Sequence, residues 1–209
     1  MNLRSILRLG MCALALGIGQ AALAAGGPLG IDRKVTYDDS GIWNRSTQKA
    51  VLGAAVLANL GTALWDGGET RAGKTSWQTV DAMLFSELTA VGLKAATARP
   101  RPRQIDDPDL WFQGSGYRSF PSEEVTVAAA AVTPWIAEYH GDHPWIWGLE
   151  LLPAYDAMAR VKVNAHWQTD VLAGWIVGSA WGYWAHNRKS PVILNVLPDG
   201  FMVGFKKKF

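Results

Sequence analysis

Five alanine-, leucine-, valine- and tryptophan-rich segments, separated by glycine, proline or charged breaks, constrain the fold of this 209-residue chain most. Their apolar residues recur at the spacing of helices that bury one face or more. The segments cover residues 48–65, 76–99, 122–140, 144–160 and 165–187. They predict an all-α helical bundle that occupies residues 48–189.

The chain begins with features of a secretory signal. Arg4 and Arg8 precede an apolar stretch, and Ala22-Leu23-Ala24 offers an A-x-A cleavage site. We therefore expect residues 1–24 to be removed and the protein to be exported to the periplasm, although an uncleaved anchor is an alternative. The only cysteine, Cys12, lies inside this signal, so the mature chain would have no thiol.

The regions that flank the bundle have a different composition. Residues 25–47 are polar and mixed, which predicts an N-terminal arm lying over the helices. Residues 190–209 contain two β-rich runs around Pro198-Asp199-Gly200, which predict a small C-terminal β-hairpin. Its basic end, Lys206-Lys207-Lys208, is either a solvated tail or a peripheral contact with anionic lipid head groups.

Charge and apolar content limit the classes of partner. Without Arg4 and Arg8 the chain has 18 basic and 18 acidic residues, a balance that does not suggest nucleic-acid binding. Most of the apolar segments are interrupted by acids or prolines and do not predict spanning helices. Residues 171–185 are apolar all round, which fits a central buried helix or, alternatively, a membrane contact.

Two basic residues mark the end of the second predicted helix. Residues 94–102 read K-A-A-T-A-R-P-R-P, so Lys94 and Arg101 lie seven positions apart, or two helical turns. Both could project toward one anion. Pro100 and Pro102 end the helix, which places Arg101 just past its last turn. Taken alone, the two cations could simply complement the helix dipole.

A second polar stretch, A-R-V-K-V-N-A-H-W-Q-T-D at residues 159–170, adds an imidazole and a carboxylate. His166 and Asp170 have i, i+4 spacing and would be neighbours on a helix surface. Arg160 lies six positions before His166, which is the wrong face of a continuous helix. We therefore expect Arg160 to arrive from a preceding turn.

Between these stretches, F-P-S-E-E-V-T at residues 120–126 predicts a helix start. Ser122 would be its N-cap, and Glu123 and Glu124 would lie in the first turn, where the helix dipole favours negative charge.

In order, K-x6-R-P, P-S-x-x and R-x5-H-x3-D resemble the signature of the superfamily of type 2 phosphatidic acid phosphatases, bacterial class A acid phosphatases and vanadium haloperoxidases. The resemblance implies a helical, metal-free phosphatase that acts on a phosphorylated small molecule or lipid through a phosphohistidine. His166 would be the nucleophile, oriented by Asp170. The phosphate-binding residues implied by the resemblance are Lys94, Arg101, Ser122 and Arg160.

The second motif departs from the P-S-G-H of that superfamily and reads P-S-E-E. Glu124 takes the place of the histidine that protonates the leaving group, and a carboxyl with a raised pKa could donate that proton. His140 or His143 could supply the acid instead. Because Glu123 and Glu124 would repel a dianion unless paired with cations, an inactive phosphate-binding relative is an alternative. A vanadate-dependent haloperoxidase is another, and vanadate could otherwise act as an inhibitor.

A long loop is predicted between the first two motifs, at residues 100–117. Its aromatic residues, Trp111, Phe112 and Tyr117, could form an apolar wall for a substrate tail. Alternatively, they pin the loop to the bundle.

Overall fold

The computed structural model describes residues 26–189 and 191–193, and the regular secondary structure within them is helical. Its α-helices are α2 (Arg45–Asp66), α3 (Arg71–Thr97), α4 (Glu123–Tyr139), α5 (Leu151–Lys162) and α6 (Gln168–His186), joined by the 3-10 helices η1 (Gly41–Trp43) and η2 (Pro144–Glu150). The β-pairing in the described residues is one isolated bridge, between Gly26 and Asp32. The predicted all-α fold is confirmed.

The fourth predicted helix, residues 144–160, is wrong in one respect, because the structure divides it into η2 and α5. Pro153 lies in the first turn of α5. Proline lacks an N–H, and only the first helical turn leaves its N–H groups without an intrahelical acceptor, so Pro153 fixes the start of α5 close to Leu151.

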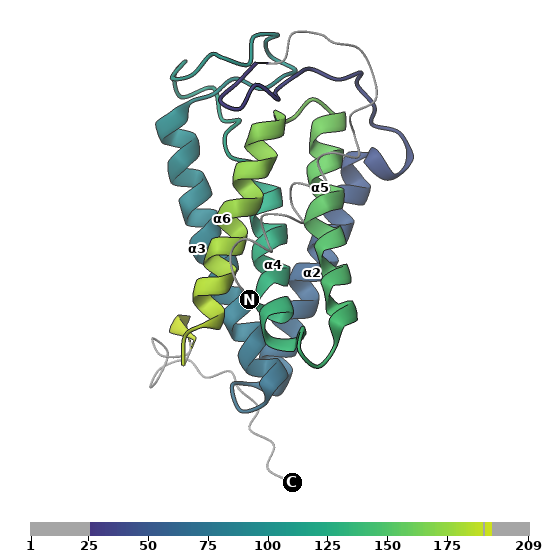
Figure 1. Ribbon diagram of the computed structural model, residues 1–209, viewed down its shortest axis with the longest axis vertical. Helices are drawn as coiled ribbons and strands as arrows, with labels where there is room; N and C mark the ends of the chain where they lie inside the picture. Colours follow the sequence, from purple (N-terminus) through teal and green to yellow (C-terminus); the bar gives the residue numbers. More distant parts are fainter. Residues whose placement is uncertain (1–25, 190, 194–209) are drawn as a thin grey trace.

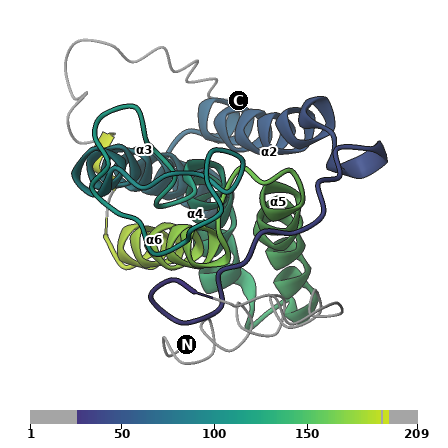
Figure 2. The same ribbon diagram turned by 90° about the horizontal axis from the view of Figure 1, so that it is seen from above.

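Helix α4 is the centre of the bundle and packs against α2, α3, α5 and α6 (Figure 2). Its alanine run, Ala128–Ala131, is fully buried. Helix α6 approaches α4 closely because it places glycines at the contact. A Cβ atom on Gly178 would lie 2.1 Å from the carbonyl oxygen of Thr126, and one on Gly174 would lie 2.5 Å from that of Ser122. Small residues on both helices therefore set this spacing.

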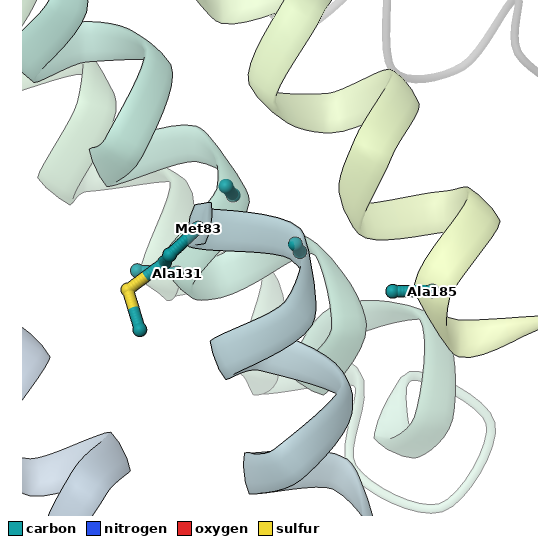
Figure 3. Close-up of a cluster of buried hydrophobic side chains, with 5 residues drawn as sticks. Met83, Ala131 and Ala185 are labelled. Atoms are coloured by element: carbon teal, nitrogen blue, oxygen red, sulfur yellow. The ribbon is translucent and has the colours of Figure 1, made fainter. Parts of the chain in front are cut away.

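The same small-residue packing joins α3 to the centre of the bundle. Met83 on α3, Ala131 on α4 and Ala185 on α6 belong to one buried cluster, drawn in Figure 3. Helix α6 contributes its glycines and Ala185 to this interior, so one face of residues 171–185 is buried as predicted, whereas Ile176, Tyr183 and Trp184 on another face are exposed. None of the helices in the described residues is long and apolar enough to cross a membrane.

One end of the bundle collects the predicted functional segments. The last turns of α3 and α5 and the first turns of α4 and α6 all lie at the top of Figure 1, where the arm before α2 and the loop after α3 cross over them. Helix α3 ends because Ala98 adopts a left-handed conformation (φ 42°) and donates its N–H to the carbonyl of Lys94. This turn directs residues 99–101 across the end of the bundle.

Two predicted terminal features fall outside the described residues. The signal peptide, residues 1–24, is one, and the C-terminal β-hairpin with its basic tail, apart from residues 191–193, is the other.

Candidate active site

A cavity of about 540 Å³ opens at the end of the bundle where the predicted motifs meet. Five cationic side chains and three carboxylates line it, together with one imidazole. The lining residues are Tyr37, Asp39, Arg45, Lys94, Arg101, Arg103, Glu123, Glu124, Arg160, Val163, Ala165 and His166. The excess of positive charge suits an anionic ligand.

Lys94 reaches the cavity from the last turn of α3 and is almost fully buried, at 2% exposure. Its Nζ donates to the carbonyl of Pro121 at 2.7 Å and to that of Arg118 at 3.2 Å, which leaves one ammonium proton for a ligand. Burial, assisted by the charge of Arg101, lowers the pKa of Lys94 to about 8, although Glu123 opposes this.

Arg101 lies past the end of α3, as predicted, and donates to the carbonyls of Ala165 (3.3 Å) and Arg118 (3.2 Å). Arg160 arrives from the last turn of α5, also as predicted, and donates to Gln48 at 3.1 Å. Burial lowers the pKa of both guanidinium groups, that of Arg101 to about 10. Backbone carbonyls therefore orient Arg101, and the side-chain amide of Gln48 orients Arg160.

His166 lies in the loop between α5 and α6 and is 3% exposed. Its Nδ1 is 2.8 Å from the backbone carbonyl of Ser119. A carbonyl can only accept, so Nδ1 carries the proton and Nε2 holds a lone pair. Burial lowers the pKa of His166 well below its ordinary value, and the charges of Arg160, Lys94 and Arg101 lower it further. The ring is therefore neutral near neutral pH.

Asp170 does not hold His166 directly, which corrects the predicted contact. The nearest approach, between Nδ1 and Oδ2, is 3.7 Å. Oδ2 instead accepts the hydroxyl of Ser119 at 2.5 Å and the N–H of Trp167 at 2.9 Å. His166 precedes α6 rather than lying within it, so helical i, i+4 geometry does not apply, and Ser119 stands between the two side chains.

Arg99 and Asp32 extend this network and were not predicted. Arg99 donates to Asp170 at 2.7 Å and to Asp32 at 2.6 Å, and all three side chains have 0% exposure. Asp32 also accepts the N–H of Thr169 at 2.7 Å, so the N-terminal arm caps α6. Nothing in the spacing distinguishes Arg99 from its basic neighbours, and Asp32 lies in a segment without periodicity.

A sequence model of the PAP2 superfamily, the superfamily of the type 2 phosphatidic acid phosphatases, matches residues 76–191, which is more than half of the chain. The chain belongs to the PAP2 superfamily. The matched region extends from α3 through α6 and contains every candidate site residue predicted from the motifs. No curated protein and no solved structure matches the chain.

The second PAP2 motif places Glu124 in an ion pair. Its two carboxylate oxygens accept from the two terminal nitrogens of Arg45 on α2, and Arg160 lies 3.5 Å away. Burial raises the pKa of Glu124, but the hydrogen bonds from Arg45 and the charges of Arg160, Arg45 and His166 outweigh it, so the pKa is lowered. Glu124 therefore lacks the raised pKa that the acid role requires, because Arg45, a cation from outside the motifs, binds this carboxylate.

Ser122 occupies the predicted N-cap position of α4, but its side chain makes no capping bond. Its Oγ is buried, has no partner among the described residues and does not line the cavity. The backbone of Ser122 lies against α6, since its N–H donates to the carbonyl of Asp170 at 2.9 Å. The predicted phosphate-binding role thus has no geometric support in this arrangement.

The remaining candidates lie away from the cavity. Trp111 packs over the Arg99 guanidinium at 4.3 Å and against Phe120, so it pins the loop, while Phe112 is 75% exposed. Neither of these aromatics nor Tyr117 lines the cavity.

His140 and His143 follow the far end of α4, about 25 Å from its first turn. Among the described residues no three His, Cys, Asp or Glu side chains gather as a metal site.

Proposed function

We propose that this chain is a periplasmic phosphatase that transfers a phosphoryl group from a phosphomonoester or a lipid-linked (di)phosphate to His166, without a metal. The observation that carries the proposal is the convergence of Lys94, Arg101 and Arg160 on one cavity with a neutral imidazole. The predicted secretory signal supports the location.

The first step uses the tautomer that Ser119 enforces. The lone pair of His166 Nε2 attacks the phosphorus atom, and the bond to the leaving oxygen breaks. Lys94, Arg101 and Arg160 bind the nonbridging oxygens and stabilise the charge of the five-coordinate transition state. The product is a phosphohistidine and an alcohol, or a phosphate ester where the substrate is a diphosphate.

In the second step water attacks the phosphohistidine and releases inorganic phosphate. Lys94, Arg101 and Arg160 stabilise this transition state as well, so the same three cations act in both steps. Asp170 acts on His166 through Ser119, as a positioning residue, by accepting the Ser119 hydroxyl while the Ser119 carbonyl holds the ring.

A second candidate function is phosphate binding without turnover. Three carboxylates share the cavity with the cations, and Glu124 already pairs with Arg45 and lies 3.5 Å from Arg160. This internal anion competes with a phosphate for the same positive charge.

The test is release of inorganic phosphate by the purified mature domain from p-nitrophenyl phosphate, phosphatidate and an isoprenyl diphosphate. We expect turnover of at least one, inhibition by orthovanadate, and a labelled, acid-labile phosphohistidine after brief exposure to ³²P-labelled substrate. His166→Ala should abolish turnover and labelling. His143→Ala, an exposed histidine beyond the far end of α4, is the matched control and should retain both. Tight phosphate binding without turnover would favour the second candidate.

A further inference from the structure

The carboxylates at the second motif are engaged by cations rather than poised as acids. Glu124 accepts hydrogen bonds from Arg45 through both carboxylate oxygens, so it is held as an ionised acceptor. Glu123 is an ion-pair partner of Lys94, with its Oε2 3.9 Å from the ammonium. The position where the leaving oxygen would take a proton is therefore occupied by paired charges.

The histidines of the chain do not replace this acid. The sequence contains four, and His166 is the proposed nucleophile. His140 and His143 follow the end of α4, and His186 ends α6, at the opposite end of the bundle from the cavity. The site therefore suits a leaving group that departs without a proton.

A phosphate monoester is such a leaving group. It loses its second proton with a pKa of about 6, so it departs from a diphosphate as a stable dianion. An alcohol is about as weak an acid as water, whose pKa is about 16, so an alkoxide needs a proton as it departs. The paired carboxylates thus favour a diphosphate over an alkyl phosphomonoester.

Arg103 offers a cation for the second phosphate of a diphosphate. Its side chain is exposed and lines the cavity beside the three cations that hold the transferred phosphoryl group in the proposed mechanism. The three carboxylates of the cavity have other partners among the described residues. These pairs are Asp39 with the Tyr37 hydroxyl, Glu123 with Lys94, and Glu124 with Arg45. Arg103 is therefore available to an anionic ligand.

Backbone contacts fix Arg103 close to the proposed nucleophile in the fold. Its N–H donates at 3.1 Å to the carbonyl of Asn164, which lies two residues before His166. Asn164 is 4% exposed, and its side chain also binds the N-terminal arm. Its Nδ2 donates to the carbonyl of Val35 at 3.0 Å, and its Oδ1 accepts the N–H of Val35 at 3.4 Å. Asn164 thus joins the arm, the loop after α3 and the segment that carries His166.

The cavity wall offers little apolar surface to the group that follows the transferred phosphate. Its aliphatic lining residues are Val163 and Ala165, and the other lining residues are polar or charged. A charged group next to the transferred phosphate therefore finds more complementary surface than an alkyl chain does.

We propose that Arg103 binds the second phosphate of a diphosphate ester whose terminal phosphate is transferred to His166. The inference rests on the proposed phosphatase function and selects diphosphates from its substrate classes. The lone pair of His166 Nε2 attacks the terminal phosphorus atom, and the bond from this atom to the bridging oxygen breaks. The bonding electron pair leaves with the phosphate monoester, whose charge Arg103 stabilises, so no proton is transferred. The water that hydrolyses the phosphohistidine supplies one oxygen of inorganic phosphate and releases one proton to the solvent.

The test compares three substrates on the purified mature domain. Butyl diphosphate has a leaving group with a second phosphate, butyl phosphate has an alkoxide leaving group, and p-nitrophenyl phosphate has a leaving group that needs no acid but carries no second phosphate. We expect the wild-type protein to hydrolyse butyl phosphate with a kcat/KM about 100-fold or more below that for butyl diphosphate. p-Nitrophenyl phosphate should be turned over as well.

Arg103→Ala tests the assigned residue. We expect kcat/KM for butyl diphosphate to fall about 10- to 100-fold, the scale for losing a charge-assisted hydrogen bond, and that for p-nitrophenyl phosphate to change less than about 2-fold. Retained p-nitrophenyl phosphate turnover also reports that the variant is folded. Lys49→Ala is the matched control, because it removes an exposed cation one turn after Arg45 that does not line the cavity. It should change neither value.

Three results would overturn the inference while the proposed function stands. They are equal rates for butyl phosphate and butyl diphosphate in the wild type, equal losses for butyl diphosphate and p-nitrophenyl phosphate in Arg103→Ala, and the same selective loss in Lys49→Ala. If the wild-type protein hydrolyses none of the three substrates, the proposed function fails and the inference fails with it.

Discussion

Arg99 and Asp170 form an ion pair whose two side chains are fully buried, with Nη1 2.7 Å from Oδ1. The pair connects the first PAP2 motif to the third. Through Asp170 it fixes Ser119, whose carbonyl holds the His166 ring, and through Asp32 it fixes the N-terminal arm. The orientation of the proposed nucleophile thus depends on residues that do not touch the cavity.

Asp32→Asn should weaken this network without changing its shape. The amide has nearly the volume of the carboxylate but loses the charge that balances Arg99, whose other buried carboxylate partner is Asp170. We expect the free energy of unfolding to fall by about 3 kcal/mol, the scale for breaking a buried ion pair. Urea denaturation measures the loss. Asp106→Asn, which removes an exposed pair with Lys34, should change stability by less than about 1 kcal/mol.

Ser119→Ala should affect the positioning of the His166 ring without affecting substrate binding. It removes the hydroxyl that Asp170 accepts at 2.5 Å but keeps the carbonyl that accepts from His166. We expect kcat to fall about 10-fold while KM changes little, because the ring loses its fixed orientation and the cations stay in place. Ser76→Ala is the control, since Ser76 is equally buried and its Oγ has no partner among the described residues. A rise in KM with unchanged kcat would contradict the positioning role.

The sequence predicted the helices from local spacing, and it predicted the cluster of Lys94, Arg101, Arg160 and His166 through the resemblance of its motifs to a known superfamily. Helical periodicity survives in a single sequence, and prolines mark where α3 must end. The hydrogen bonds of Glu124 and Asp170 could not be predicted in this way. Arg45 lies 79 residues from Glu124, and Asp32 lies 67 from Arg99, so tertiary packing alone brings these partners together.

Glu124→Ala should strengthen anion binding. In the structure the Glu124 carboxylate forms an ion pair with Arg45 and lies 3.5 Å from Arg160. Its removal makes both guanidinium groups available to a ligand. We expect the Kd for phosphate or orthovanadate, measured by calorimetry, to fall about 3- to 10-fold, which corresponds to roughly 1 kcal/mol. Glu138→Ala is the matched control, because Glu138 pairs with Arg71 at the far end of α4 and should leave the Kd unchanged. Weaker binding in Glu124→Ala would mean that Glu124 organises Arg45 for the ligand.

Asp156 on α5 predicts a pH-dependent stability. Its side chain is 2% exposed, and its Oδ2 has no partner among the described residues. Burial raises its pKa to about 7, Glu124 adds to the shift, and Arg160 and Arg45 oppose it. The pKa of Asp156 is higher in the folded protein than in the unfolded chain. The free energy of unfolding therefore falls progressively as pH rises from about 4 to about 7.

Asp156→Asn removes the ionisation and should therefore stabilise the fold only where Asp156 is charged. We expect the variant to gain on the order of 2 kcal/mol over the wild type at pH 8 and to show little difference at pH 4. Urea denaturation at both pH values measures the gain. Asp107→Asn, an exposed carboxylate, is the control and should show no such pH dependence. A variant that is less stable than the wild type at pH 8 would show instead that the attraction of the Asp156 charge to Arg160 and Arg45 outweighs the cost of burying it.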